Sequence, residues 1–225
     1  MESREQETQP PKAPERTPPP QLLPACIALL TLALGLALGL HPLQPPEVTP
    51  AEAPESEFSA ERAYVHVEKL ALKPRPPGSQ AHREAREYLI QQISTFGASV
   101  EVQETSVVRS TKRSLAIATT VKNIVARIQG SGSSDRALML LAHYDSVSVA
   151  PGASDDAAGV ATLLETLRVL SNVPPLENDL ILLITDGEEL GLLGARAFLQ
   201  EHPWSRDPII FALSTITRAV KLDGI

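Results

Sequence analysis

LMLLA at residues 138–142 and LILLI at residues 180–184 are the two stretches that decide the fold. Both are unbroken apolar runs of strand length, without the alternation of apolar and polar residues that a half-buried strand shows. Parallel strands that are covered on both faces have this pattern. A helical pattern over residues 156–170 separates the two runs, so the sequence predicts a strand–helix–strand unit with parallel strands.

Further elements extend this unit in both directions. Amphipathic helices are predicted over residues 59–72 and 81–96. Strands are predicted over residues 100–108, 121–128 and 209–213, the first two as an antiparallel pair. We therefore expect an α/β fold with a mixed, mainly parallel sheet and helices on both faces.

The part of the chain before these elements divides by composition into three segments. Residues 1–20 combine prolines and charges with few apolar side chains, which predicts a disordered tail. Residues 21–41 are almost wholly Leu, Ala, Ile and Gly, a run about as long as a helix that spans a bilayer. Residues 42–58 are rich in proline and are expected to form an extended stalk.

Two other interpretations of the apolar run are a buried core helix and a cleaved signal peptide. A core helix would not normally lie between two proline-rich polar stretches. A signal peptide would be followed by a small-residue cleavage site, and no clear one follows here. We therefore expect an uncleaved signal anchor that contacts the lipid bilayer through residues 21–41.

Lys and Arg residues on either side of the anchor predict its orientation. Arg4, Lys12 and Arg16 precede the anchor, whereas no Lys or Arg follows it until Arg62. The folded part is therefore expected on the exoplasmic side of the membrane, which is the periplasm, the extracellular space or the lumen of an organelle.

Composition excludes some classes of function. The net charge is −7 and no basic stripe is present, which argues against a nucleic-acid partner. Cys26 is the single cysteine and lies in the apolar run, so no intrachain disulfide can form. The 225 residues allow one globular domain with accessory segments.

Three polar clusters lie at or between the ends of the two apolar runs. They contain, in chain order, His143 and Asp145, Asp155 and Asp156, and Glu188 and Glu189. Open α/β sheets bind ligands beyond the carboxyl ends of their strands, so we expect the clusters to converge there. Two zinc ions about 3.5–4 Å apart need a bridging carboxylate, terminal His and acidic ligands, and a base. The clusters contain all of these residue types.

Each cluster alone also has a simpler structural interpretation. A histidine at a strand end is often only a hydrogen-bonded rim residue, Asp156 could cap the following helix, and the glutamate pair could open a helix at Leu190. Asp145 nevertheless lies two residues from His143, on the same side of an extended chain. A zinc-bound imidazole commonly has a carboxylate partner in such a place.

Taken together, the clusters resemble the co-catalytic two-zinc aminopeptidase family of secreted bacterial leucyl aminopeptidases. The motifs that carry this resemblance are His143-x-Asp145-Ser146, Pro151-Gly152-Ala153-x-Asp155-Asp156-x-x-Gly159 and Glu188-Glu189-x-Gly191-x-x-Gly194. The membrane anchor and His202-Pro203-Trp204 make the chain similar to the branch that contains endoplasmic reticulum metallopeptidase and vacuolar membrane protease.

The resemblance implies a role for each cluster. His143 and Glu189 would each bind one zinc ion, and Asp155 would bridge the two ions. Asp145 would orient His143, and Glu188 would be the general base. The implied activity is that of a zinc-dependent metalloexopeptidase, which hydrolyses peptide bonds in a peptide or protein substrate with a water activated by two zinc ions.

The end of the sequence departs from the family pattern. Family members have a further acidic zinc ligand after the next strand and a final histidine beyond it. Asp223 is the only acidic residue in residues 208–225, and no histidine follows His202. We therefore expect a truncated chain, with an incomplete zinc aminopeptidase-like domain over residues 59–207 and a divergent tail over residues 208–225. The alternative is a noncatalytic family member that acts as a scaffold or has no function.

Overall fold

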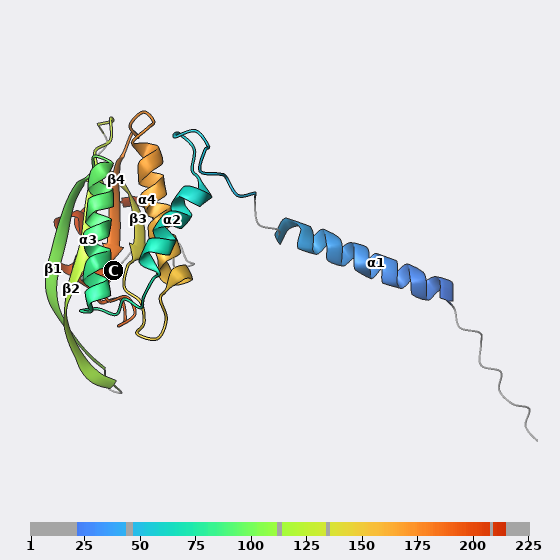
Figure 1. Ribbon diagram of the computed structural model, residues 1–225, viewed down its shortest axis with the longest axis horizontal. Helices are drawn as coiled ribbons and strands as arrows, with labels where there is room; N and C mark the ends of the chain where they lie inside the picture. Colours follow the sequence, from blue (N-terminus) through green and yellow to red (C-terminus); the bar gives the residue numbers. More distant parts are fainter. Residues whose placement is uncertain (1–21, 44–46, 112–113, 134–135, 208, 215–225) are drawn as a thin grey trace, which may run out of the picture. The chain divides into compact units, whose positions relative to one another are not determined.

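The computed structural model describes residues 22–43, 47–111, 114–133, 136–207 and 209–214 (Figure 1). The chain divides into two compact units, Met1–Glu47 and Val48–Ile225. In the first unit, helix α1 (Leu22–Leu40) is followed by the short helix η1 (His41–Leu43). Within the described residues, α1 is the one helix that is long and apolar enough to cross a membrane. The tail predicted over residues 1–20 lies outside the described residues.

The second unit is built on a sheet whose five described strands have the order β1-β2-β4-β3-β5. The strands are β1 (Ser99–Thr111), β2 (Ser114–Ile128), β3 (Ala137–His143), β4 (Asp179–Thr185) and β5 (Ile209–Ser214). Strand β2 is antiparallel to β1 and β4, whereas β3 is parallel to β4 and β5. The mixed sheet and each predicted strand are therefore confirmed.

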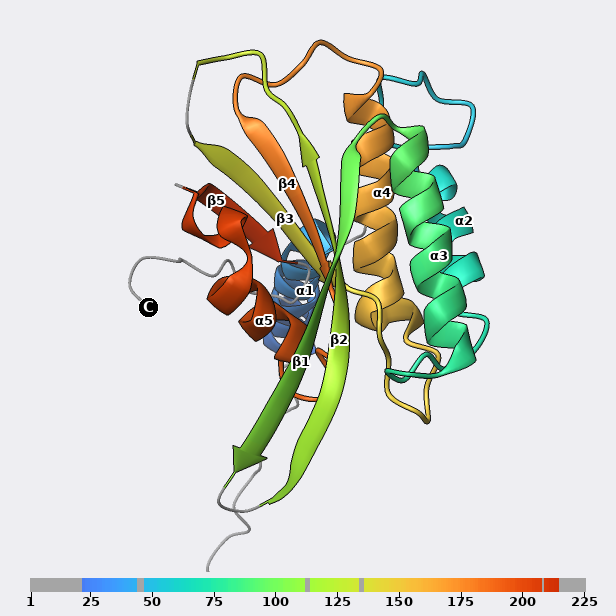
Figure 2. The same ribbon diagram turned by 90° about the vertical axis from the view of Figure 1, so that its left-hand side faces the viewer.

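Helices cover both faces of this sheet (Figure 2). Helices α2 (Ala60–Leu70), α3 (Gln80–Thr95) and α4 (Ala158–Leu170) lie on one side, and α5 (Leu193–Glu201) lies on the other. Ser59 and Ser79 directly precede α2 and α3 and cap them, because each side chain accepts a hydrogen bond from the main-chain N–H three residues ahead. The helices predicted over residues 59–72, 81–96 and 156–170 are confirmed within a few residues.

Strand β4 shows why the apolar runs are unbroken. Leu182 and Ile184 pack into the core that α3 and α4 cover, whereas Ile181 and Leu183 pack with Phe198 of α5 on the opposite face. Successive side chains of a strand point to opposite faces, so a strand covered on both faces has no position left for a polar residue.

Helix α5 begins at Leu193, three residues after the predicted start at Leu190. Gly191 and Leu192 have φ angles of 103° and 60°, in the left-handed region that a right-handed helix cannot contain. Their N–H groups both donate to the carbonyl of Glu188, at 2.7 and 2.9 Å. The glutamate pair therefore lies in a tight turn that precedes the helix.

Residues 48–58 belong to the second unit, so this part of the stalk predicted over residues 42–58 is folded and contains turns. Proline removes N–H donors from this segment but leaves carbonyl acceptors. Arg62 and Arg168 donate to these acceptors, which are the carbonyls of Ala51, Ala53, Pro54, Glu55 and Glu57. Glu165 holds both arginines, with its carboxylate 3.1 Å from Arg62 Nε and 2.7 Å from Arg168 Nε.

Candidate functional site

The polar clusters meet at the carboxyl ends of β3 and β4. His143 is the last residue of β3 and pairs in register with Thr185, the last residue of β4. The turn after β4 carries Glu188, and the short helix η2 (Ala153–Ala157) carries Asp155. His143 Nε2 lies 2.9 Å from Asp155 Oδ1 and 3.9 Å from Glu188 Oε2. One residue from each cluster therefore lies at the same point.

The imidazole of His143 is fully buried and held by its neighbours. Its Nδ1 lies 3.2 Å from the carbonyl oxygen of Asp145 and 3.4 Å from Asp145 Oδ1. The main-chain N–H of His143 donates to Asp156 Oδ2 at 3.1 Å. These contacts fix the ring so that Nε2 faces Asp155, which supports the orienting role predicted for Asp145.

Asp145 also holds the turn that carries the glutamate pair. Its Oδ1 accepts a hydrogen bond from the main-chain N–H of Glu188, and its Oδ2 accepts one from the N–H of Glu189, both at 3.1 Å. Asp145 is fully buried, so these bonds are shielded from water. One carboxylate therefore links the histidine cluster to the glutamate cluster, a contact that the sequence did not predict.

The two aspartates of η2 have different surroundings. The side chain of Asp155 is 76% exposed, whereas Asp156 is buried and also accepts a hydrogen bond from Gly159 N at 3.2 Å. Asp156 thus makes the kind of hydrogen bond to the first turn of α4 that the capping interpretation predicts, although Ala157 is the residue that directly precedes the helix. Gly152 precedes η2 with a φ of 63°, and a Cβ there would lie 2.4 Å from the carbonyl oxygen of Asp155. The backbone at position 152 therefore comes so close to the backbone of Asp155 that only glycine fits there.

Negative charge dominates the electrostatics of the site. Burial raises the pKa of Glu188, and the neighbouring carboxylates add to this rise although His143 opposes it. Burial and the charge of Asp155 likewise raise the pKa of Glu189. Burial alone would lower the pKa of His143, but Asp145 above all, with the adjacent aspartates, raises it to about 9. The site therefore favours a bound positive charge.

A second polar network supports the glutamate turn, and sequence reasoning did not identify it. His82 Nε2 lies 2.9 Å from Asp186 Oδ1, and both side chains are buried. Asn123 Oδ1 accepts a hydrogen bond from Asp186 N at 3.0 Å, and Asn123 Nδ2 donates to the carbonyl of Gly194 at 2.8 Å. An amide within an apolar strand is the signal that could have identified Asn123.

The donor types at this point are those that zinc prefers, namely an imidazole nitrogen and carboxylate oxygens. His143 and Asp155 are in direct contact, and Glu188 and Glu189 stand on the adjoining turn. Across the part of the chain that the structure describes, however, no group of three or more His, Cys, Asp or Glu side chains is arranged to hold a metal ion. The described residues thus have the chemistry of a zinc site but form only part of one.

Comparison with known proteins gives the site a context. Residues 123–225 match the family described as Peptidase family M28, and this match includes the segment 208–225 that we expected to be divergent. Vacuolar membrane protease of Eremothecium gossypii is 31% identical over 161 residues, which cover 64% of this chain and 16% of that protein. Endoplasmic reticulum metallopeptidase 1 of Rattus norvegicus is 31% identical over 193 residues, which cover 80% of this chain and 21% of that protein. The chain therefore spans about a fifth or less of the length of these relatives.

Solved structures share the fold. Porphyromonas gingivalis glutaminyl cyclase is 26% identical with a TM-score of 0.58, and the match covers 70% of this chain and 58% of that one. A Zn-dependent exopeptidase from Parabacteroides distasonis is 22% identical with a TM-score of 0.58, covering 70% of this chain and 61% of that one. These matches confirm the predicted α/β fold of the zinc exopeptidase type.

Proposed function

This chain carries a Peptidase family M28 domain, and on that premise we propose that it is a membrane-anchored, zinc-dependent aminopeptidase-type hydrolase. The observation that carries the proposal is the convergence of His143, Asp155 and Glu188 at the carboxyl edge of the sheet. The names of the two relatives, a membrane protease and a metallopeptidase, support the same activity. Anchoring through residues 21–41, with the domain on the exoplasmic side, is part of the proposal and is supported by α1.

The metal-binding roles follow the family pattern. His143 and Glu189 would each hold one of two zinc ions, and Asp155 would bridge them. Zinc, when bound, supplies polarisation of the scissile carbonyl and a water of lowered pKa. Asp145 keeps the His143 ring in place and holds the N–H groups of the glutamate turn, so it sets the geometry of both ligand clusters.

Glu188 is the residue that moves the proton. Its carboxylate accepts a proton from the attacking water as the new C–O bond forms, and then donates this proton to the amine nitrogen as the peptide C–N bond breaks. The side chain of Glu188 is 22% exposed, so its carboxylate is accessible from the surface of the site. A main-chain N–H bond to Asp145 holds Glu188 in place without using its own carboxylate.

A noncatalytic family member is the second candidate. The observation that favours it is the incomplete ligand set over the described residues, since a divalent ion with too few donors binds weakly. In that case the chain keeps the fold and the buried network around His143 without turnover.

The test is peptide hydrolysis by the 225-residue chain, purified in detergent with zinc present. The substrates are a peptide with a free amino terminus, its N-acetylated form, and a peptide that begins with glutamine. We expect release of the first residue from both peptides that have a free amino terminus and no release from the acetylated form. Loss of ammonia from the glutamine peptide would instead assign the cyclase chemistry of the P. gingivalis relative.

Glu188→Gln is the informative variant, because it removes the base and keeps the size of the side chain. We expect hydrolysis to fall by at least about 100-fold. Glu68→Gln is the matched control, since Glu68 is exposed on α2, away from the glutamate turn. A folded wild-type chain without hydrolysis supports the noncatalytic candidate, and equal rates for Glu188→Gln and wild type contradict the role of Glu188.

A further inference from the structure

Arg75 lies in the loop between α2 and α3 and is 2% exposed. Its guanidinium donates to four main-chain carbonyls, those of Tyr144 at 3.0 Å, Leu70 at 2.5 Å, Pro151 at 2.5 Å and Gly152 at 3.5 Å. A buried arginine is usually explained by a carboxylate partner. Each of these four acceptors is instead a backbone oxygen, so Arg75 holds the backbone segments that carry these carbonyls in place.

The backbone of Arg75 is attached to the same loop. Its N–H donates to Ser146 Oγ at 2.8 Å, and its carbonyl accepts a hydrogen bond from Ser146 N at 3.2 Å. Ser146 directly follows Asp145, and its hydroxyl lies 3.0 Å from the carbonyl of Ala150. The side chain and the backbone of Arg75 therefore hold both ends of the loop over residues 144–152.

These contacts connect the two parts of the proposed metal site. Tyr144 lies between His143 and Asp145, and Gly152 lies three residues before Asp155. The guanidinium is a rigid planar fork, so bonds to both segments fix the spacing between them. Arg75 acts here together with Asp156, whose carboxylate accepts a hydrogen bond from His143 N and so also links the two segments.

The charge of Arg75 suits the same role. Burial lowers the pKa of Arg75, and the carboxylate of Asp145 opposes this effect. A buried cation beside a cluster of carboxylates offsets part of their mutual repulsion. Lysine would keep this charge but could not reach the same set of carbonyls in a fixed plane.

We infer that Arg75 is a positioning residue, which sets the separation of His143 and Asp155 by holding the loop that joins them. The inference rests on the proposed function for its meaning, because that separation matters only if the two side chains share metal ions. Arg75 itself is expected to touch neither the substrate nor the metal.

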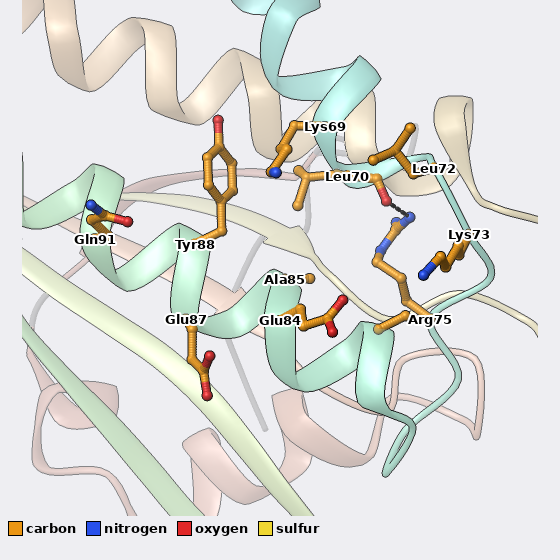
Figure 3. A pocket seen from close by; sticks show the side chains of 11 residues that line it. Lys69, Leu70, Leu72, Lys73, Arg75, Glu84, Ala85, Glu87, Tyr88 and Gln91 are labelled. Carbon is orange, nitrogen blue, oxygen red and sulfur yellow. Dashed lines mark hydrogen bonds between the residues drawn. The ribbon is translucent and has the colours of Figure 1, made fainter.

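The surroundings of Arg75 allow this role to be tested by chemical rescue. Arg75 lines a cavity of about 430 Å³ between the end of α2 and α3, and Figure 3 shows its guanidinium reaching the carbonyl of Leu70 at the edge of this cavity. Exposed Lys69, Lys73 and Glu84 also line the cavity, so it is open to solvent. A free guanidinium ion can therefore enter the space that a shortened side chain leaves.

The experiment compares Arg75→Lys and Arg75→Ala with Arg62→Lys in the full chain. Arg62 is the matched control because it also ties several backbone carbonyls, but those lie in the segment 48–58. The measurements are zinc affinity, by competition with a chelating dye, and hydrogen–deuterium exchange along the chain. We expect both Arg75 variants to lose at least about 10-fold in zinc affinity and to exchange faster over residues 143–159. Arg62→Lys should exchange faster only near residues 48–62 and keep its zinc affinity.

Low millimolar guanidinium, with urea and sodium chloride as controls, should restore zinc affinity and slow exchange over residues 143–159 in Arg75→Ala. It should leave the faster exchange of Arg62→Lys near residues 48–62 unchanged. Unchanged exchange over residues 143–159 in Arg75→Lys, or zinc affinity within about twofold of wild type in a folded variant, overturns the inference. If the wild-type chain binds no zinc, the proposed function fails. The exchange pattern and its rescue then decide alone whether Arg75 positions the loop.

Discussion

Glu165→Ala is expected to loosen the segment 48–58 and to lower the stability of the second unit. The Glu165 side chain is 1% exposed and accepts four hydrogen bonds. These come from Ser59 N, from Arg62 Nε and from two nitrogens of Arg168, at 2.7–3.1 Å. The substitution removes the carboxylate, so Arg62, Arg168 and the N–H of Ser59 lose this hydrogen-bond acceptor.

The size of the effect follows from the burial of the partners. Removing one member of a buried ion pair costs about 3–5 kcal/mol. Arg62 and Arg168 retain 19% and 16% exposure, so water can partly replace the lost acceptor. We therefore expect a loss of about 3 kcal/mol, at the lower end of that range. For a domain of this size the melting temperature should fall by about 6–12 °C.

Thermal unfolding followed by circular dichroism, with the full chain in one fixed detergent, measures this change. Limited proteolysis provides a second measurement, because cleavage within the segment 48–58 should become faster. Glu68→Ala is the control, since Glu68 is exposed on α2, the helix that also carries Arg62. The reasoning is refuted if Glu165→Ala and Glu68→Ala agree within about 0.5 kcal/mol, or if cleavage of the segment is unchanged.

Two further predictions follow. Burial alone would raise the pKa of Glu165, but hydrogen bonds from the arginines and from Ser59 lower it below the usual value of 4.5. The stabilisation is then complete above about pH 4.5 and is lost as the pH falls through the lower folded-state pKa. The melting temperature of wild type should therefore fall more steeply in acid than that of Glu165→Gln, and parallel curves would contradict this. Gly194→Ala places a Cβ 2.2 Å from Asn123 Oδ1 and 2.3 Å from the carbonyl of Asp186. The substitution should lower the free energy of unfolding in urea by about 1–3 kcal/mol. Gly35→Ala is the control and should leave it unchanged, because a Cβ at Gly35 would have no neighbour within 4 Å. Equal urea midpoints for the two variants would contradict the close packing around Gly194.

The parts of the fold that the sequence predicted are those with a strong local pattern. Strands β3 and β4 were predictable because burial on both faces leaves an unbroken apolar run. The approach of His143 to Glu188 was predictable because the carboxyl ends of the parallel strands β3 and β4 share one edge of the sheet. The sequence alone was therefore enough to predict that motif residues at those strand ends lie close together.

The parts that the sequence did not predict depend on distant residues or on backbone conformation. Arg168 binds the carbonyl of Glu55 across 113 positions of sequence, and His82 meets Asp186 across 104. No local pattern reports such contacts. The late start of α5 depends on Leu192, a non-glycine residue with a φ of 60°, and propensity alone would place Leu192 within a helix.

The zinc content of the purified 225-residue chain tests the central claim most directly, measured by elemental analysis for wild type, Asp155→Ala and Glu188→Gln. The account predicts bound zinc in wild type, its loss in Asp155→Ala, and its retention in Glu188→Gln, because Glu188 is proposed as the base and not as a ligand. A folded wild-type chain without zinc contradicts the account and leaves the noncatalytic candidate.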